Sequence, residues 1–175
     1  AGLPLALTPA AGLVEAIFRL HLHAKRVSVK KEVPSEKYYF KDALKLIRHP
    51  SILRCLESGR DILPSMIAGS GGAFLSCMDI LNQAGSCSPE EQHLLSLVFR
   101  EWTSPGDGAR CFHDLIPALL QSPADDVEQE SLGALLRLTN NILTLMAREN
   151  VVLSLSAVLE LYRQSISVTR LPFYG

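Results

Sequence analysis

Apolar residues recur at helical spacing along most of this chain. In residues 114–145, DLIPALLQSPADDVEQESLGALLRLTNNILTL, they predict one apolar helix, a short acidic break and a second, longer apolar helix. Such spacing is typical of helices that bury one face. A pair of helices built in this way cannot bury both apolar faces against one another and needs neighbours on either side, as the units of helical repeat proteins do. The pattern therefore predicts a stack of helices.

The same periodicity, with capping residues and breaks, predicts further helices. The start at Ser88-Pro89-Glu90-Glu91 is well marked, because it combines a capping hydroxyl, a proline at the first helical position and acidic residues near the positive helix end. An alternation of apolar residues leaves a strand open at 20–24. The helices are expected at 9–26, 35–48, 50–58, 60–68, 73–84, 89–102, 109–121, 125–147 and 150–165, with GSGG at 69–72 and TSPGDG at 103–108 as turns or loops.

Composition narrows the class of protein. Hydrophobic residues make up 47% of the chain and aromatic residues only 6%, with leucine dominating the apolar set. Leucine loses little rotamer freedom in a helix, so we expect an all-α fold. DILPSMI at 61–67 and DLIPALL at 114–120 are similar, which leaves both an internal repeat and chance similarity open.

The expected organisation is an N-terminal helix with a basic linker (1–34), a helical segment (35–170) and a tail (171–175). The chain begins with Ala rather than Met, and we expect it to be a piece of a longer protein. Its formal charge of −1 gives no global attraction to nucleic acid. Four cysteines without a CxxC pair indicate a reduced, intracellular chain, nuclear or cytoplasmic, with a secreted four-cysteine domain as the alternative. No segment predicts a membrane span.

Residues 116–141, IPALLQSPADDVEQESLGALLRLTNN, resemble the second and third helices of an armadillo or HEAT repeat. Ile-Pro opens one helix, Leu119-Leu120 closes it, and the apolar residues of the next helix follow at the spacing of that family. Ser131 and Gly133 depart from the pattern by replacing small apolar residues, and Gly133 costs helix stability unless a neighbouring helix packs closely over it. The resemblance implies an armadillo/HEAT-like helical solenoid that binds proteins and needs no cofactor.

Protein partners, and neither a membrane nor a small-molecule substrate, are therefore expected. The predicted partner-binding residues are Arg137 and Asn141, on the groove, and Trp102, as an aromatic anchor if it is exposed. The alternative for Trp102 is core packing. One hypothesis for the parent protein is a scaffold acting in meiotic double-strand-break formation, and no motif in these residues supports it.

A basic segment offers a second function. Arg19, Lys25, Arg26, Lys30 and Lys31 form the densest cluster of cations in the chain. They predict either an exposed charged surface without a partner or a nucleic-acid-binding helical module. Within the same segment, two histidines at 21 and 23 would share a face only on a strand, so we interpret them as part of the solvated basic surface rather than as metal ligands.

Catalytic motifs are weak. Cys111-Phe112-His113-Asp114 places a thiol, an imidazole and a carboxylate together, but Cys111 and His113 point about 200° apart on a helix. Cys111 would share its face with Asp114, and a nearby carboxylate raises a thiol pKa. We therefore expect a buried cysteine and a surface histidine, and no catalytic or metal-binding residues.

Overall fold

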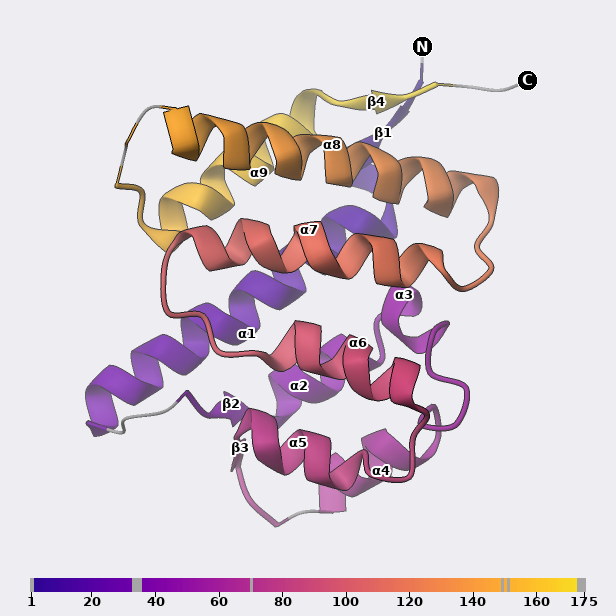
Figure 1. The fold of residues 1–175 in the computed structure, drawn as a ribbon, viewed down its shortest axis with the longest axis vertical. Helices are drawn as coiled ribbons and strands as arrows, with labels where there is room; N and C mark the ends of the chain where they lie inside the picture. Colours follow the sequence, from indigo (N-terminus) through magenta and orange to yellow (C-terminus); the bar gives the residue numbers. More distant parts are fainter. Residues whose placement is uncertain (1, 33–35, 70, 149, 151, 173–175) are drawn as a thin grey trace. The chain divides into compact units, whose positions relative to one another are not determined.

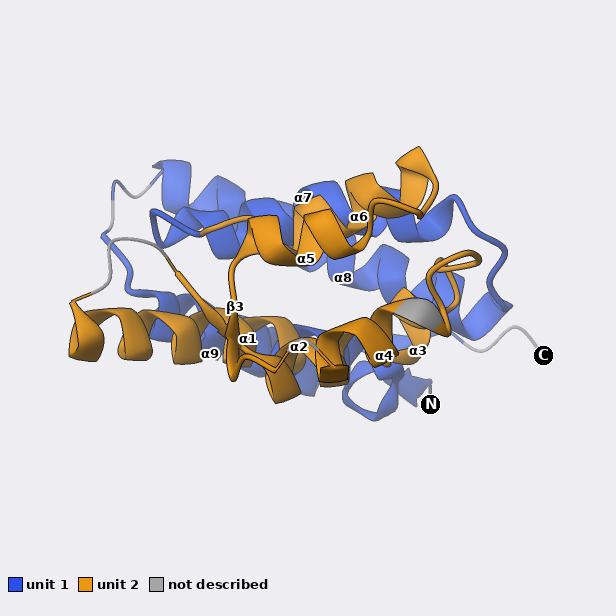
Figure 2. Ribbon diagram, turned by 90° about the horizontal axis from the view of Figure 1, so that it is seen from below, with its two compact units in different colours: residues 1–15, 102–175 blue, residues 16–101 orange. Residues whose placement is uncertain are grey.

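A computed structural model describes residues 2–32, 36–69, 71–148, 150 and 152–172. The fold is all-α, apart from four two-residue strands among these residues. The chain forms two compact units: unit 1 comprises Ala1–Glu15 and Trp102–Gly175, and unit 2 comprises Ala16–Glu101 (Figure 2). Helix α1 (Pro9–Lys31) contributes its first residues to unit 1 and the rest to unit 2.

Unit 1 joins the two ends of the chain. Strand β1 (Leu3–Pro4) pairs antiparallel with β4 (Arg170–Leu171), with Leu3 opposite Leu171. A 3₁₀ turn, η1 (Leu5–Leu7), follows β1 and packs against α9 (Leu155–Val168). The long helices α7 (Gly106–Leu120) and α8 (Asp126–Arg148) lie side by side (Figure 1). Helix α9 contacts both of them.

The core of unit 1 combines leucine packing with one buried polar pair. Phe112 of α7 meets Tyr162 of α9 with a ring-centroid separation of 5.4 Å. The Tyr162 hydroxyl lies 2.8 Å from the Thr139 hydroxyl of α8, and both side chains are fully buried. Because a buried hydroxyl needs a partner, this hydrogen bond fixes α8 and α9 in register more specifically than leucine contacts do.

Unit 2 contains the second part of α1 and a set of shorter helices. These helices are α2 (Phe40–Ile47), α3 (Pro50–Leu53), α4 (Ile62–Gly69), α5 (Cys77–Gln83) and α6 (Pro89–Phe99). Strand β2 (Tyr38–Tyr39) pairs antiparallel with β3 (Phe74–Leu75). Helix α4 packs against α2 and α5, and α5 packs against α6.

The capping signal at Ser88 is confirmed. Ser88 and Glu91 form a reciprocal capping box, and Glu91 also accepts a hydrogen bond of 2.6 Å from the Ser58 backbone N–H. Burial raises the pKa of Glu91, but the N–H donors of Ser58 and Ser88 outweigh it and lower the pKa below its usual value. Glu91 therefore both caps the start of α6 and binds the loop at Ser58, 33 residues earlier in the chain.

Several expected helices have other bounds in the structure. Helix α1 continues to Lys31 rather than ending at 26, and α3 ends at Leu53 rather than at 58. Helix α2 begins at Phe40, not at residue 35, because Tyr38 and Tyr39 pair with β3; Ser35 lies outside the described residues. Pairing with β2 likewise delays α5 to Cys77. Helix α7 begins at Gly106, inside the expected loop, and α9 begins at Leu155, after the Ser154 hydroxyl caps it. The strand alternative at 20–24 is wrong, since α1 covers it.

The two similar segments occupy different positions in their helices. DILPSMI lies at the start of α4, whereas DLIPALL forms the end of α7 with Pro117 inside the helix. This difference favours chance similarity over an internal repeat. The domain boundaries after residues 34 and 170 stay predictions, and residues 173–175 of the tail lie outside the described part. Within the described residues, no helix is long and apolar enough to cross a membrane.

Candidate interaction surfaces

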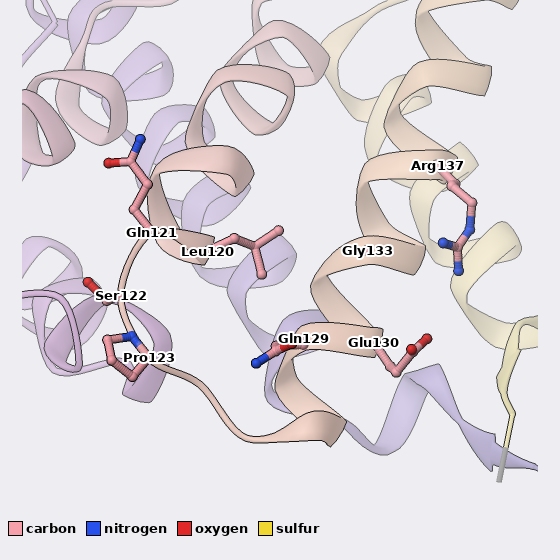
Figure 3. A pocket seen from close by; sticks show the side chains of 8 residues that line it. All are labelled: Leu120, Gln121, Ser122, Pro123, Gln129, Glu130, Gly133 and Arg137. Carbon is pink, nitrogen blue, oxygen red and sulfur yellow. The ribbon is translucent and has the colours of Figure 1, made fainter. Parts of the chain in front are cut away.

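A groove runs along unit 1 where the end of α7 faces the first half of α8. Its volume is about 530 Å³, and both helices and their connection line it. Figure 3 shows Leu120 extending from α7 toward α8, with Gln129 and Glu130 on the facing turns. Leu120 is 37% exposed, which is unusual for a leucine at a helix–helix contact. The groove therefore offers a partner the apolar side chain of Leu120 among mostly polar lining residues. Its lining residues are Leu120, Gln121, Ser122, Pro123, Gln129, Glu130, Gly133 and Arg137.

Arg137, predicted from the sequence, lies at one end of this groove. Its side chain is exposed and folds back along α8 toward the turn that carries Gly133 (Figure 3). A β-carbon built on Gly133 would meet only the Arg137 guanidinium, with Nη1 at 3.7 Å. No neighbouring helix therefore packs closely over Gly133 among the described residues. The glycine instead leaves the floor of the groove open.

The other two predicted partner-binding residues differ in exposure. Asn141 is exposed one turn beyond Arg137 on α8 and extends the same face of the helix, although it does not line the groove. Trp102 is 1% exposed, so the prediction of an aromatic anchor is wrong and the core alternative holds. An indole is large and mostly apolar, so its burial in the core is more favourable than its exposure on a short loop.

A second hollow lies on unit 1 beside the first turns of α8. It has a volume of about 250 Å³ and is bounded by the β1–β4 pair, through Leu3 and Leu171, and by Val127, Gln129 and Glu130. Val127 is 49% exposed. Gln129 and Glu130 line both hollows, so this part of α8 has a concave surface on each side. Sequence reasoning missed it because the strands come from opposite ends of the chain.

The basic segment on α1 is largely exposed. Arg19, Arg26 and Lys30 are seven and four residues apart, which aligns them on one face of the helix, and all three are exposed. Lys31 is also exposed, and its Nζ lies 4.6 Å from the centre of the Phe74 ring. Lys25 differs, because its Nζ lies 2.7 Å from Glu36 Oε1 and its charge is neutralised there.

The interpretation of the two histidines as solvated surface is wrong for His21. His21 is 0% exposed; its Nε2 lies 3.0 Å from the Val98 carbonyl oxygen and its Nδ1 3.4 Å from Glu36 Oε2. Each ring nitrogen therefore lies near an oxygen atom. Half-buried His23 lies 2.6 Å from Asp42 Oδ2. The two rings thus hold separate carboxylates and do not converge.

The buried carboxylate of Glu36 is the centre of this cluster. Burial raises the pKa of Glu36, but hydrogen bonds and charge from His21 and Lys25 outweigh burial and lower it. The Glu36 backbone N–H also points to Glu101 Oε1 at 3.4 Å. No sequence signal revealed these contacts, since their partners are separated by 11 to 65 residues. The cluster holds the extended segment before β2 against α1.

Cys111 and His113 lie as expected, the thiol buried and the imidazole exposed. Asp114 does not share the buried face of Cys111; it is exposed, with Oδ1 2.9 Å from His113 Nδ1. A surface pair of this kind is worth little. Within the described ranges, no three histidine, cysteine or carboxylate side chains gather as metal ligands would.

Comparisons of this chain with protein-family models, with curated proteins and with solved structures found no match. The class that the structure defines is therefore an all-α chain of two compact helical units. Any finer assignment depends on the surfaces described above.

Proposed function

We propose that this chain is a non-enzymatic scaffold that binds protein partners through the groove between α7 and α8. The observation that carries the proposal is the groove itself, with the partly exposed Leu120 on one wall and polar side chains on the other. Peptide-binding grooves combine an apolar anchor site with polar groups that fix orientation. An extended or helical peptide with one apolar side chain for Leu120 is the partner that this chemistry fits.

The armadillo/HEAT-like solenoid is part of the same proposal. Its support is the antiparallel pair α7 and α8, joined by a short connection, with α9 packed against both. Helical repeats expose such a pair along a concave face. The conspicuous reactive residues also support a non-catalytic role, because Cys111 is buried and His21 is bound to Val98 and Glu36.

The test is selection of peptides from a displayed library on the immobilised chain, followed by measurement of the selected peptides on three variants, two of which change the charge equally. Arg137→Glu should weaken the selected peptides about tenfold or more, since it reverses the charge at the end of the groove. Asn141→Ala should weaken them less. The control is Arg148→Glu, which lies on the same helix outside the groove. Equal loss in both arginine variants would show that the peptides respond to overall charge, and the groove would then not be the binding site.

A further inference from the structure

Positive charge is concentrated in one part of the chain. All six lysines lie between residues 25 and 45, and the stretch from Arg19 to Arg48 holds nine basic residues against three acidic ones. Two of these three carboxylates are already engaged, Glu36 by His21 and Lys25 and Asp42 by His23. The exposed basic surface is therefore wider than the α1 segment and extends onto α2.

On α2 the exposed cations share one face. Lys41, Lys45 and Arg48 are four and three residues apart and all exposed, whereas Ala43, Leu46 and Ile47 bury the opposite side. His23 of α1 bonds Asp42 of α2, so this contact links the basic stripe of α1 to the basic face of α2. The result is one surface of unit 2 with cations from two helices.

Aromatic side chains lie within this surface, and they are not sealed in the core. Tyr39, Phe40 and Phe74 are half-buried; the Tyr39 ring contacts Phe40 at 5.2 Å and Phe74 at 5.7 Å between centroids. The Lys31 ammonium covers the Phe74 ring, and the Lys41 ammonium lies 6.0 Å from the centre of the Phe40 ring. The aromatic cluster is thus flanked by cations from α1 and α2.

Beside Phe40 the surface is hollowed. A pocket of about 270 Å³ is lined by Phe40, Ala68, Gly71, Gly72 and Ala73. The Phe40 backbone N–H bonds the Ala73 carbonyl oxygen at 3.0 Å, which brings the glycine turn alongside the ring. The described glycines leave it open, because a β-carbon on Gly71 would meet nothing within 4 Å. A flat ring placed in the pocket would contact the Phe40 ring, the small side chains of two alanines and the Gly71–Gly72 backbone.

We propose that this surface of unit 2 binds single-stranded nucleic acid, with a base against Phe40 in the pocket and phosphates on Lys41 and Lys45. Proteins that bind single strands combine cations along the backbone with aromatic side chains on which unpaired bases stack. A duplex keeps its bases paired and fits the cations alone. An acidic peptide would use the lysines and leave the pocket beside Phe40 empty. The proposal does not depend on the groove of unit 1.

The experiment measures fluorescence anisotropy of labelled 20-nucleotide poly-dT and poly-rU strands with the whole chain, from 50 to 300 mM salt. Two variants address the two kinds of contact. Lys41→Gln/Lys45→Gln should weaken binding and lower the slope of log K against log salt by about 1.4, which is the value for two lost phosphate contacts to a single strand. Phe40→Leu should weaken binding about 5- to 150-fold, the range of one lost stacking contact, with the slope unchanged.

Two further variants separate binding from folding and from charge. Phe40→Tyr keeps an aromatic ring and should restore the affinity that Phe40→Leu loses. Arg137→Gln/Arg148→Gln removes the same charge from unit 1 and should leave binding within about twofold. The comparison of poly-dT with poly-rU assigns DNA or RNA, and a matched duplex should bind more weakly than either strand.

Several outcomes would overturn the proposal. If neither strand shows salt-sensitive binding at 50 mM salt, the surface does not bind nucleic acid. If duplex and single strand bind equally and Phe40→Leu does not weaken binding, no base lies against Phe40. Competition by a 20-residue oligoglutamate at lower concentration than unlabelled poly-dT would assign the surface to an acidic protein. A loss in Arg137→Gln/Arg148→Gln equal to that in Lys41→Gln/Lys45→Gln would reduce the effect to overall charge.

Discussion

Gly133→Ala should stabilise this protein. Gly133 is one of two residues at which the chain departs from the armadillo/HEAT pattern, which has a small apolar residue there. Gly133 is the eighth residue of a 23-residue helix and is half-buried. Alanine is favoured over glycine in a helix interior by about 0.5 to 1 kcal/mol, because glycine loses more backbone freedom on folding. The new methyl group would meet Arg137 Nη1 at 3.7 Å, an ordinary contact that adds no strain.

The full gain of about 0.5 to 1 kcal/mol should therefore appear, as a rise of about 1 to 4 °C in the Tm of the whole chain. Circular dichroism and calorimetry measure it directly. Gly59→Ala is the contrasting variant: its β-carbon would lie 2.8 Å from Leu63 Cδ1 and 2.9 Å from Cys87 Sγ, in a buried site. Overpacking there should cost about 1 to 3 kcal/mol. An unchanged or lower Tm in Gly133→Ala would refute the reasoning and indicate a close contact over Gly133.

Two further predictions concern polar groups of unit 1. Tyr162→Phe should cost about 1 to 3 kcal/mol, since it leaves the buried Thr139 hydroxyl without its partner, and adding Thr139→Val should recover part of that loss in a double-mutant cycle by urea denaturation. Equal, additive losses would contradict the pairing. Asp107 has a pKa lowered from 3.8 to about 2, so its contribution is complete above about pH 4 and is lost as pH falls toward 2. Asp107→Asn should flatten the urea midpoint over that range, and an unchanged profile would show that other carboxyls govern acid unfolding.

Burial and hydrogen bonding act in opposite directions on the pKa of Asp107. Burial raises the pKa of this carboxyl, but the Arg110 guanidinium and the backbone N–H groups of Ser104 and Thr103 outweigh it. Asp107 Oδ2 accepts from the Thr103 N–H at 2.7 Å and from the Ser104 N–H at 2.8 Å. The carboxylate form is the one that accepts all these bonds, which is why the lowered pKa makes the protein more stable above pH 4 than below it.

Local signals in the sequence predicted the parts of the fold that local interactions determine. The start of α6 follows from Ser88 and Glu91, which bond each other within one turn. The segment 36–39 could not be predicted in this way. Its residues have helical spacing, yet Tyr38 pairs with Leu75 and Glu36 is held by His21 and Lys25. Tertiary contacts override a helical preference that is worth only a few tenths of a kcal/mol per residue.

The candidate sites divide in the same way. Exposure of Arg137 and Asn141 follows from the apolar stripe of α8, which places both on the polar face. The surface around Phe40 does not follow from any window of sequence, because Gly71 and Ala73 reach it only through the pairing of β2 with β3. A period of apolar residues indicates which face of a helix is buried, but not which distant loop will line a pocket beside it.

The two proposed surfaces must be separated by point variants, because deletion cannot separate the units. Unit 1 is built from both ends of the chain, so removing residues 1–15 takes away β1 and the fully buried Leu5 along with the start of α1. The units also differ in charge: residues 16–101 hold twelve basic and nine acidic residues, and the rest of the chain holds five basic and nine acidic. The net charge of −1 is therefore the sum of a basic unit and an acidic one.

Under both proposals, Arg137→Glu impairs peptide binding alone and Lys41→Gln/Lys45→Gln impairs nucleic-acid binding alone. Loss of both activities in either variant would mean that they share one surface.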